Sequence, residues 1–303
     1  MVRVPGQKPE SLTLAHIERL IVRGSSTISS GLLAKCWERQ ISVLFLSGRR
    51  SEATAKFEGG FHHDAAIRLA QSSLYLNPVK RLDIAKLILR FKLCAQYVEI
   101  KHFVKSYPKG SAGAFNAISA LNKAKIKVRN DPPNSLSALR GLEGAAAAAY
   151  FQSYITFFPE SLGFSRRIRR PPTDPVNAAL SLGYTLALSE AARSLNVVGL
   201  DPAIGFLHEI SYNRSALALD LVEPLRPLVD RFVLNTFRSR KLTARHFKSQ
   251  SDGSIILGKS GRAHFYSCWE ENAPSIRRVA TQHSKAAAKY VREISKNDCW
   301  IDE

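Results

Sequence analysis

Four side chains suited to holding a divalent cation occur in the middle of this sequence. Glu143 lies in an alanine-rich, helix-forming segment, and His208 follows a loop rich in glycine and proline. Asp220 and Glu223 come shortly afterwards. Mg²⁺ prefers carboxylate oxygens and water, and Mn²⁺ accepts an imidazole as well. A cation held by such groups polarises a phosphodiester and activates an attacking hydroxyl or water. The residue types therefore indicate metal-dependent phosphodiester chemistry.

Each of these residues also has a purely structural interpretation. The spacing of Asp220 and Glu223 places both carboxylates on one face of a helix, but it is also the spacing of a helix capping box. His208 could be a packed, hydrogen-bonded histidine, and Glu143 could be a solvated residue of its helix. A buried acid among closely packed alanines is costly unless a cation neutralises it. That cost makes a metal-binding role for Glu143 physically coherent.

The composition predicts a polyanionic partner. The chain has 303 residues, of which 45% are hydrophobic, and its net charge is +19. No apolar run approaches the length of a membrane span, so DNA or RNA is favoured over a membrane surface. The first residues lack the apolar core of a secretory signal, which predicts a cytoplasmic protein. The four cysteines have no paired ligand spacing, and we expect reduced thiols at Cys36, Cys94, Cys268 and Cys299.

Hydrophobic patterns divide the chain into a short β part and a long helical part. Residues 17–22 and 41–46 are rich in β-branched and aromatic side chains, with a serine-capped helix expected between them over 28–39. Paired glycines at 59 and 60 mark a linker. We therefore predict an α+β, predominantly α protein. A small N-terminal β domain spans residues 1–60, and a larger all-helical catalytic domain spans 61–303.

Helical periodicity continues through the second part. Residues 65–73 and 77–103 carry apolar stripes, whose aromatics we expect in the core and whose charged residues we expect in solvent. Breaks are expected at 106–113 and 130–135. Either Ser135 or Ser137 then caps the helix that carries Glu143.

Two basic segments are candidates for binding DNA. The loop at 157–175 combines one aromatic residue, Phe164, with four arginines, which suits phosphate clamping and base stacking on splayed strands. These arginines are Arg166, Arg167, Arg169 and Arg170. Further along, Lys241, Arg245 and Lys248 are expected to contact the DNA backbone without reading its sequence.

Four segments together resemble one known family. They read LRGLEGAA at 139–146, RPPTDPVNA with LGY at 170–184, GLDPAIGFLH at 199–208 and SALALDLVEPLRP at 215–227. In this order and spacing they resemble the integrase family of CRISPR spacer acquisition. The resemblance covers about residues 12 to 290 and is strongest over 139–231.

The resemblance implies roles for individual residues. Glu143, His208 and Glu223 would hold Mg²⁺ or Mn²⁺, and Asp220 would be the fourth catalytic residue, supporting these ligands from behind. Asn177 and Tyr184, two helical turns apart, would line the active site. The implied reaction is transesterification, in which the 3′-hydroxyl of a short DNA fragment attacks a phosphodiester at a repeat boundary. Water as the nucleophile gives endonuclease activity, and the reverse reaction disintegrates branched DNA.

The resemblance also implies partners. They are double-stranded and branched DNA, from the protospacer and the CRISPR repeat, a second copy of the chain in a homodimer, and a small ferredoxin-like CRISPR adaptation protein that bridges two dimers. A membrane is not among them, and the expected location is the cytoplasm of a prokaryote.

The sequence departs from the family in two places. The family usually has another hairpin before residue 12, so we expect a trimmed N-terminal sheet. Pro224 and Pro227 follow Glu223, and because proline is tolerated only in a first turn, we expect a helix that starts close to Asp220.

Two alternatives remain at this point. One is a transposon-encoded relative with the same chemistry and another target, which usually carries a C-terminal helix-turn-helix that is not seen before Glu303. The other is a catalytically silent DNA-binding scaffold, which the filled acidic and imidazole positions disfavour.

Overall fold

The computed structural model describes residues 8, 11, 13–17, 19–24, 26–39, 41–46, 53–57 and 64–296. These fall into two compact units, one within Met1–Phe61 and the other within His62–Glu303. The expected glycine linker at 58–60 lies outside the described residues.

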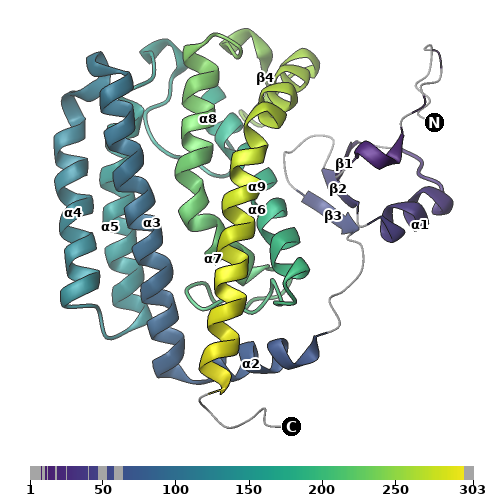
Figure 1. The fold of residues 1–303 in the computed structure, drawn as a ribbon. Coiled ribbons are helices and arrows are strands. Elements are labelled where there is room, and N and C mark those ends of the chain that lie inside the picture. Colours follow the sequence, from purple (N-terminus) through teal and green to yellow (C-terminus); the bar gives the residue numbers. More distant parts are fainter. Residues whose placement is uncertain are drawn as a thin grey trace. The chain divides into compact units, whose positions relative to one another are not determined.

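The N-terminal unit is a three-stranded mixed sheet with one helix (Figure 1). Strand β1 (Arg19–Arg23) pairs in parallel with β2 (Ser42–Leu46), and α1 (Ser30–Glu38) forms the crossover that a parallel pair requires. Ser29 caps α1 by accepting a hydrogen bond from the Leu32 N–H at 3.3 Å. A short 3-10 turn, η1 (Leu14–His16), precedes β1.

The third strand of this sheet, β3 (Ala53–Phe57), pairs antiparallel with β2 and was not predicted. Alternating alanines give it little of the β-branched and aromatic composition that marks a strand. The core of the unit is built around Cys36, Ile41 and Val43.

The second unit is almost entirely helical, which confirms the predicted fold class (Figure 1). Its first half contains α2 (Ala65–Leu76), α3 (Pro78–Ser106), α4 (Ala114–Asn130) and α5 (Leu136–Ile155), with the 3-10 turn η2 (Pro108–Gly113) before α4. Helices α3, α4 and α5 pack against one another. Asn77 and Ser135 cap α3 and α5 through their side chains, as helix-start patterns predict.

The second half of this unit is built around α6 (Pro175–Val197). It continues through α7 (Ala216–Val222), the 3-10 turn η4 (Glu223–Leu225), α8 (Arg226–Arg238) and α9 (Lys259–Lys296). The turns η3 (Glu160–Leu162) and η5 (Ala244–His246) and a hairpin of β4 (Phe247–Ser249) and β5 (Ile255–Leu257) complete it.

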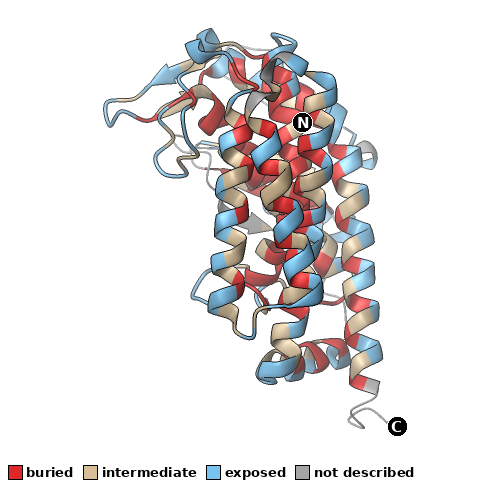
Figure 2. Ribbon diagram, turned by 90° about the vertical axis from the view of Figure 1, so that its left-hand side faces the viewer, coloured by how far each residue is buried: buried red, intermediate tan, exposed pale blue. Residues whose placement is uncertain are grey.

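The core lies around α6, which packs against α7, α8 and α9. This helix is buried on nearly all sides, as expected for a central helix. Gly183 permits its close approach to α8, because a Cβ there would lie 2.7 Å from a methyl carbon of Val229. Figure 2 shows buried residues on the faces that the helices turn to one another and exposed residues on the outer faces. No helix in the described part of the chain is long and apolar enough to cross a membrane.

Two charged residues of α3 contradict the expectation that its charges are solvated. Lys92 and Glu99 are both buried, whereas the aromatic ring of Phe91 is half exposed. Glu99 receives two hydrogen bonds from Arg231 of α8, at 2.7 and 2.6 Å. Helix α3 is covered by other helices on more than one side. Its charged residues can be buried where these neighbours supply residues of opposite charge.

Candidate metal centre

The loop that carries His208 connects α6 to α7, and one buried carboxylate organises it. Asp220, 1% exposed, accepts backbone hydrogen bonds from Phe206 at 2.6 Å, Leu207 at 3.0 Å and His208 at 2.9 Å. Gly205 allows this loop to lie against α7, because a Cβ there would come within 2.6 Å of the backbone of Ala216. Asp220 therefore binds the backbone of the loop that precedes α7 in the sequence, and it does not cap its own helix.

The same carboxylate fixes the imidazole. His208 Nδ1 lies 2.6 Å from Asp220 Oδ1. A carboxylate that already accepts three N–H groups is an acceptor here too, so we assign the ring proton to Nδ1. His208 Nε2 then presents a lone pair, and it lies 3.8 Å from Glu223 Oε1. An imidazole in this tautomer is ready to bind a cation.

Glu223 follows directly after α7, in η4, and α3 packs against this turn. Its side chain is 5% exposed. Arg226, one turn later, donates a hydrogen bond from Nε to Glu223 Oε1 at 3.0 Å. Burial opposes ionisation of Glu223, but the charges of Arg226 and Lys92 outweigh it and hold the pKa of this carboxyl well below its usual range. Glu223 is therefore ionised.

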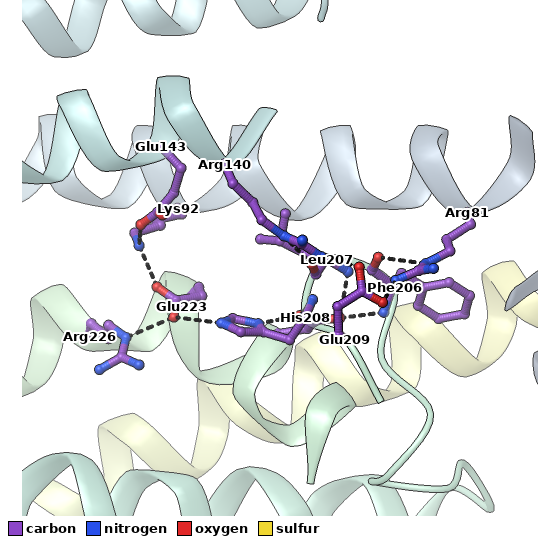
Figure 3. A network of polar contacts seen from close by, with 11 residues as sticks. Arg81, Lys92, Arg140, Glu143, Phe206, Leu207, His208, Glu209, Glu223 and Arg226 are labelled. Carbon is purple, nitrogen blue, oxygen red and sulfur yellow. Dashed lines mark hydrogen bonds and ion pairs between the residues drawn. The ribbon is translucent and has the colours of Figure 1, made fainter. Parts of the chain in front are cut away.

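Glu143 reaches the same place from α5, and Lys92 of α3 lies between the two acids (Figure 3). The Lys92 ammonium donates a hydrogen bond to Glu143 Oε1, and it lies 2.5 Å from Glu223 Oε2. Glu143 is more accessible than expected for a residue packed among alanines, with 27% of its side chain exposed. Ala145 and Ala148 of the same run are also exposed.

The donor chemistry of this place fits a hard divalent cation. Two carboxylates and the Nε2 atom of His208 face one region from three elements of the fold, and the imidazole is oriented by Asp220. Among the residues that the structure describes, no group of three His, Cys, Asp or Glu side chains is placed so that it could hold a metal ion. The Lys92 ammonium instead lies between the carboxylates of Glu143 and Glu223.

Two arginines hold the His208 loop from the other side (Figure 3). Arg140 of α5 donates to the Leu207 carbonyl, from Nε at 3.1 Å and from Nη2 at 2.7 Å. Arg81 of α3 donates to the Phe206 carbonyl at 3.2 Å. Both guanidinium groups also reach the Glu209 carboxylate, each at 2.7 Å. These three charged side chains are called the loop clamp below.

Five residues of this region were missed from the sequence: Arg81, Lys92, Arg140, Glu209 and Arg226. A signal existed for Arg140, because it lies three residues before Glu143 and so on the same face of α5. Lys92 lacked such a signal, since its partners come from α5 and η4, far away in the sequence.

The structure corrects the expected start of the helix before Glu223. Helix α7 begins at Ala216, so Asp220 lies inside it, and Glu223 begins a separate 3-10 turn. Pro224 is accommodated in the first turn of η4. The capping-box interpretation of Asp220 and Glu223 is wrong, because Ser215 is the N-cap residue and the two acids face the His208 loop and Lys92.

Asn177 and Tyr184 lie behind the Arg-rich loop and the metal centre. Asn177 is fully buried, and its Oδ1 accepts hydrogen bonds from Arg167 at 2.8 Å and from the Ile168 N–H at 2.9 Å. The ring of Tyr184 faces the guanidinium of Arg226 at 4.7 Å. Asn177 therefore holds the Arg-rich loop in its conformation. Tyr184 contacts Arg226, and Arg226 is hydrogen-bonded to Glu223.

The basic segments divide into exposed and internal side chains. Arg166, Arg169 and Arg170 are exposed, whereas Arg167 also reaches Ser181 at 3.2 Å and faces the Tyr184 ring at 5.4 Å. Phe164 is buried against Tyr154 and Phe158, so the expectation that it stacks on bases is wrong. The second basic segment is exposed at Lys241, Arg245 and Lys248. Lys241 pairs with Glu271 at 2.7 Å.

Comparison with known proteins assigns this chain to a family. The family described as CRISPR associated protein Cas1 matches residues 1–271. This chain belongs to the Cas1 family.

Curated relatives agree with this assignment. A CRISPR-associated endonuclease Cas1 of Thermodesulfovibrio yellowstonii is 40% identical over 270 residues, which cover 88% of this chain and 83% of the relative. Another, from Thermus thermophilus, is 34% identical over 269 residues, which cover 87% of this chain and 74% of the relative.

Solved structures show the same fold at lower identity. A Cas1 protein from Thermotoga maritima superposes with a TM-score of 0.81 at 23% identity, covering 92% of this chain and 87% of that one. A casposase bound to integration product superposes with a TM-score of 0.80 at 22% identity, covering 91% and 78%.

Proposed function

We propose that this protein is a metal-dependent DNA integrase of CRISPR spacer acquisition. It joins short protospacer DNA to the repeat boundaries of a CRISPR array and has endonuclease activity in the same site. Membership in the Cas1 family and relatives named as endonucleases support the class of activity. The observation that carries the site is the double role of Asp220, which folds the His208 loop and orients its ring toward Glu223.

The reaction conserves the number of phosphodiester bonds. The oxygen of a 3′-hydroxyl on the incoming DNA forms a bond to phosphorus and loses its proton, while the existing bond from phosphorus to a 3′ oxygen breaks. That oxygen takes up a proton and leaves as a new 3′-hydroxyl. No external energy source is needed, so the protein must position groups and stabilise charge. Water in place of the hydroxyl gives hydrolysis, and the reverse reaction separates branched DNA.

Glu143, Glu223 and His208 would hold Mg²⁺ or Mn²⁺. When bound, the ion polarises the phosphodiester and offsets the charge that builds up on its oxygens. The chain itself supplies three further contributions. Asp220 accepts the Nδ1–H of His208 and so turns Nε2 toward Glu223, Arg226 keeps Glu223 ionised, and the loop clamp fixes the position of His208 relative to α5.

The charge and the reaction imply the partners. A net charge of +19 favours association with DNA. Joining both strands of a fragment requires two active sites, so we propose a homodimer as the minimum unit. One solved structure with this fold is named a Cas6-RT-Cas1–Cas2 complex, and this chain covers 33% of the matched chain. We propose a small ferredoxin-like adaptation protein as the bridging partner, acting with this protein in the prokaryotic cytoplasm.

The test is strand transfer of a labelled duplex with 3′-hydroxyl ends into a supercoiled plasmid that carries a CRISPR repeat. The assay is run with Mn²⁺, with Mg²⁺ and with EDTA, with and without candidate adaptation proteins. The variants are His208→Ala, Glu143→Gln and Glu223→Gln, and the exposed acid Glu160 provides the matched control Glu160→Gln. We expect metal-dependent joining by the wild type and the control, and at least about a hundredfold loss in each site variant, with DNA binding retained.

Other outcomes identify the alternatives. Joining that ignores the repeat would indicate a transposon-type target, for which the fold likeness to a casposase offers a precedent in architecture alone. Tight DNA binding without joining under any metal or partner would indicate a silent scaffold and overturn the proposal.

A further inference from the structure

Lys92 is a buried cation at the centre of the candidate metal site. Its side chain is 6% exposed, and its ammonium contacts Glu143 from α5 and Glu223 from η4. A buried ammonium is costly unless opposite charges compensate it. Two buried or half-buried carboxylates brought close together have the same requirement. Lys92 and the two acids therefore depend on one another in the protein without metal.

The ammonium is nevertheless an imperfect partner for Glu223. Glu223 Oε2 has no hydrogen bond of acceptable direction among the described residues, although Lys92 Nζ lies 2.5 Å away. The contact is therefore electrostatic without being well directed. The neighbouring His208 Nε2 presents a lone pair that an ammonium on the far side of Glu223 does not use. The place offers more acceptor capacity than a lysine can satisfy.

We propose that Lys92 is a resident counter-ion, which a divalent cation displaces from Glu143 and Glu223. This inference rests on the proposed metal centre. A divalent cation and an ammonium that share the same two carboxylates repel each other strongly at a separation of a few ångströms. The four-carbon stem of lysine lets the ammonium withdraw while α3 stays in place. Lys92 thus keeps the site formed before metal arrives, and it lowers the affinity for the metal in doing so.

The experiment measures Mn²⁺ binding to the full chain without DNA, by isothermal titration and by the metal dependence of Tm. The variants are Lys92→Gln, which removes the charge, and Lys92→Arg, which retains it. Lys101→Gln removes a charge from an exposed position on the same helix and serves as the control. For Lys92→Gln we expect a lower Tm without metal, a Kd for Mn²⁺ lower by about tenfold or more, and a larger rise in Tm on saturation.

Two results support the counter-ion role of Lys92, and two contradict it. A Lys92→Gln variant that is unfolded without metal and folds on addition of Mn²⁺, as seen by circular dichroism, supports the proposal. So does a Lys92→Arg variant that keeps the metal-free Tm and binds Mn²⁺ no more tightly than the wild type. Equal or weaker Mn²⁺ binding by Lys92→Gln overturns the counter-ion role and leaves the metal centre intact. Failure of the wild type and every variant to bind Mn²⁺ overturns the metal centre together with this inference.

Discussion

At the scale of single residues, the candidate metal centre is backed by a second buried acid. Asp230 of α8 accepts hydrogen bonds from the hydroxyl groups of Tyr150, at 2.9 Å, and Tyr184. The Tyr184 ring in turn faces Arg226, the partner of Glu223. Burial raises the pKa of Asp230 to about 7, against the opposing effects of both tyrosines and of Arg226. Arg226, which is hydrogen-bonded to Glu223, is therefore connected through Tyr184 to Asp230, a carboxyl that changes its charge near neutral pH.

This shift predicts a pH dependence of stability. The pKa of Asp230 is raised from 3.8 in the unfolded chain to about 7 in the folded protein, so the folded state binds more protons between these values. Its contribution to stability is therefore complete below about pH 4 and is lost as the pH rises through 7. Between pH 5 and pH 7 we expect a loss of about 2 kcal/mol from this group.

The measurement is urea unfolding of the wild type and of Asp230→Asn across this range. The asparagine cannot ionise, so the difference between the two free energies of unfolding isolates Asp230 from the other carboxyls. We expect this difference to shift in favour of the variant as the pH rises. A difference that stays constant from pH 5 to pH 8 would show that Asp230 ionises at its ordinary pKa.

At the scale of elements, the decisive part is the loop between α6 and α7, which is held on both sides. Its amides at 206–208 bind Asp220, and its carbonyls at 206 and 207 bind the two arginines of the loop clamp. Arg140 belongs to the same helix as Glu143, so it ties the His208 loop to the helix that carries this acid. We therefore expect the placement of His208 relative to Glu143 to depend on Arg140.

Arg140→Lys tests this coupling. Lysine retains the charge but lacks the planar group that reaches the Leu207 carbonyl and Glu209 together. We expect hydrogen exchange of the 206–208 amides to accelerate by about tenfold, and Mn²⁺ to bind more weakly, while Tm changes little. Arg129→Lys, on the exposed face of α4, is the control. Unchanged exchange at 206–208, or equal acceleration throughout the chain, would contradict the role assigned to the clamp.

The elements that the sequence predicted well are those with local signals. The caps at Ser29 and Ser135 lie within three residues of the amides that they bind, and α6 shows its burial in its composition. Strand β3 could not be predicted from its own residues, because it is stabilised by pairing with β2. The burial of Lys92 could not be predicted either, because the acids that compensate its charge come from α5 and η4. The assignment of Glu143, His208 and Glu223 as metal ligands rests on a resemblance across four segments and stays a prediction, since spacing alone left capping and metal binding equally open.

At the scale of the whole molecule, the excess of positive charge is divided between internal and external uses. Arg167, Arg226 and Arg231 are engaged with Asn177, Glu223 and Glu99, so they contribute to folding. Exposed side chains such as Arg166 and Arg169 can reach a polyanion. Net charge alone therefore overstates how many side chains can reach DNA, and the Arg-rich loop is a case where adjacent residues divide between the two uses.

The salt dependence of DNA binding tests this division. Each protein charge that meets a duplex phosphate adds about 0.9 to the slope of log K against log salt. Replacing the exposed arginines Arg166, Arg169 and Arg170 with alanine should make the slope shallower by about 2 to 3. Replacing Lys123, Lys127 and Arg129 on α4 removes the same charge elsewhere. Because counterion release follows contacts rather than net charge, the loop variant should lose more slope than the α4 variant. Equal slopes in the two triple variants would remove the loop from the DNA interface and leave only the general attraction of a basic protein.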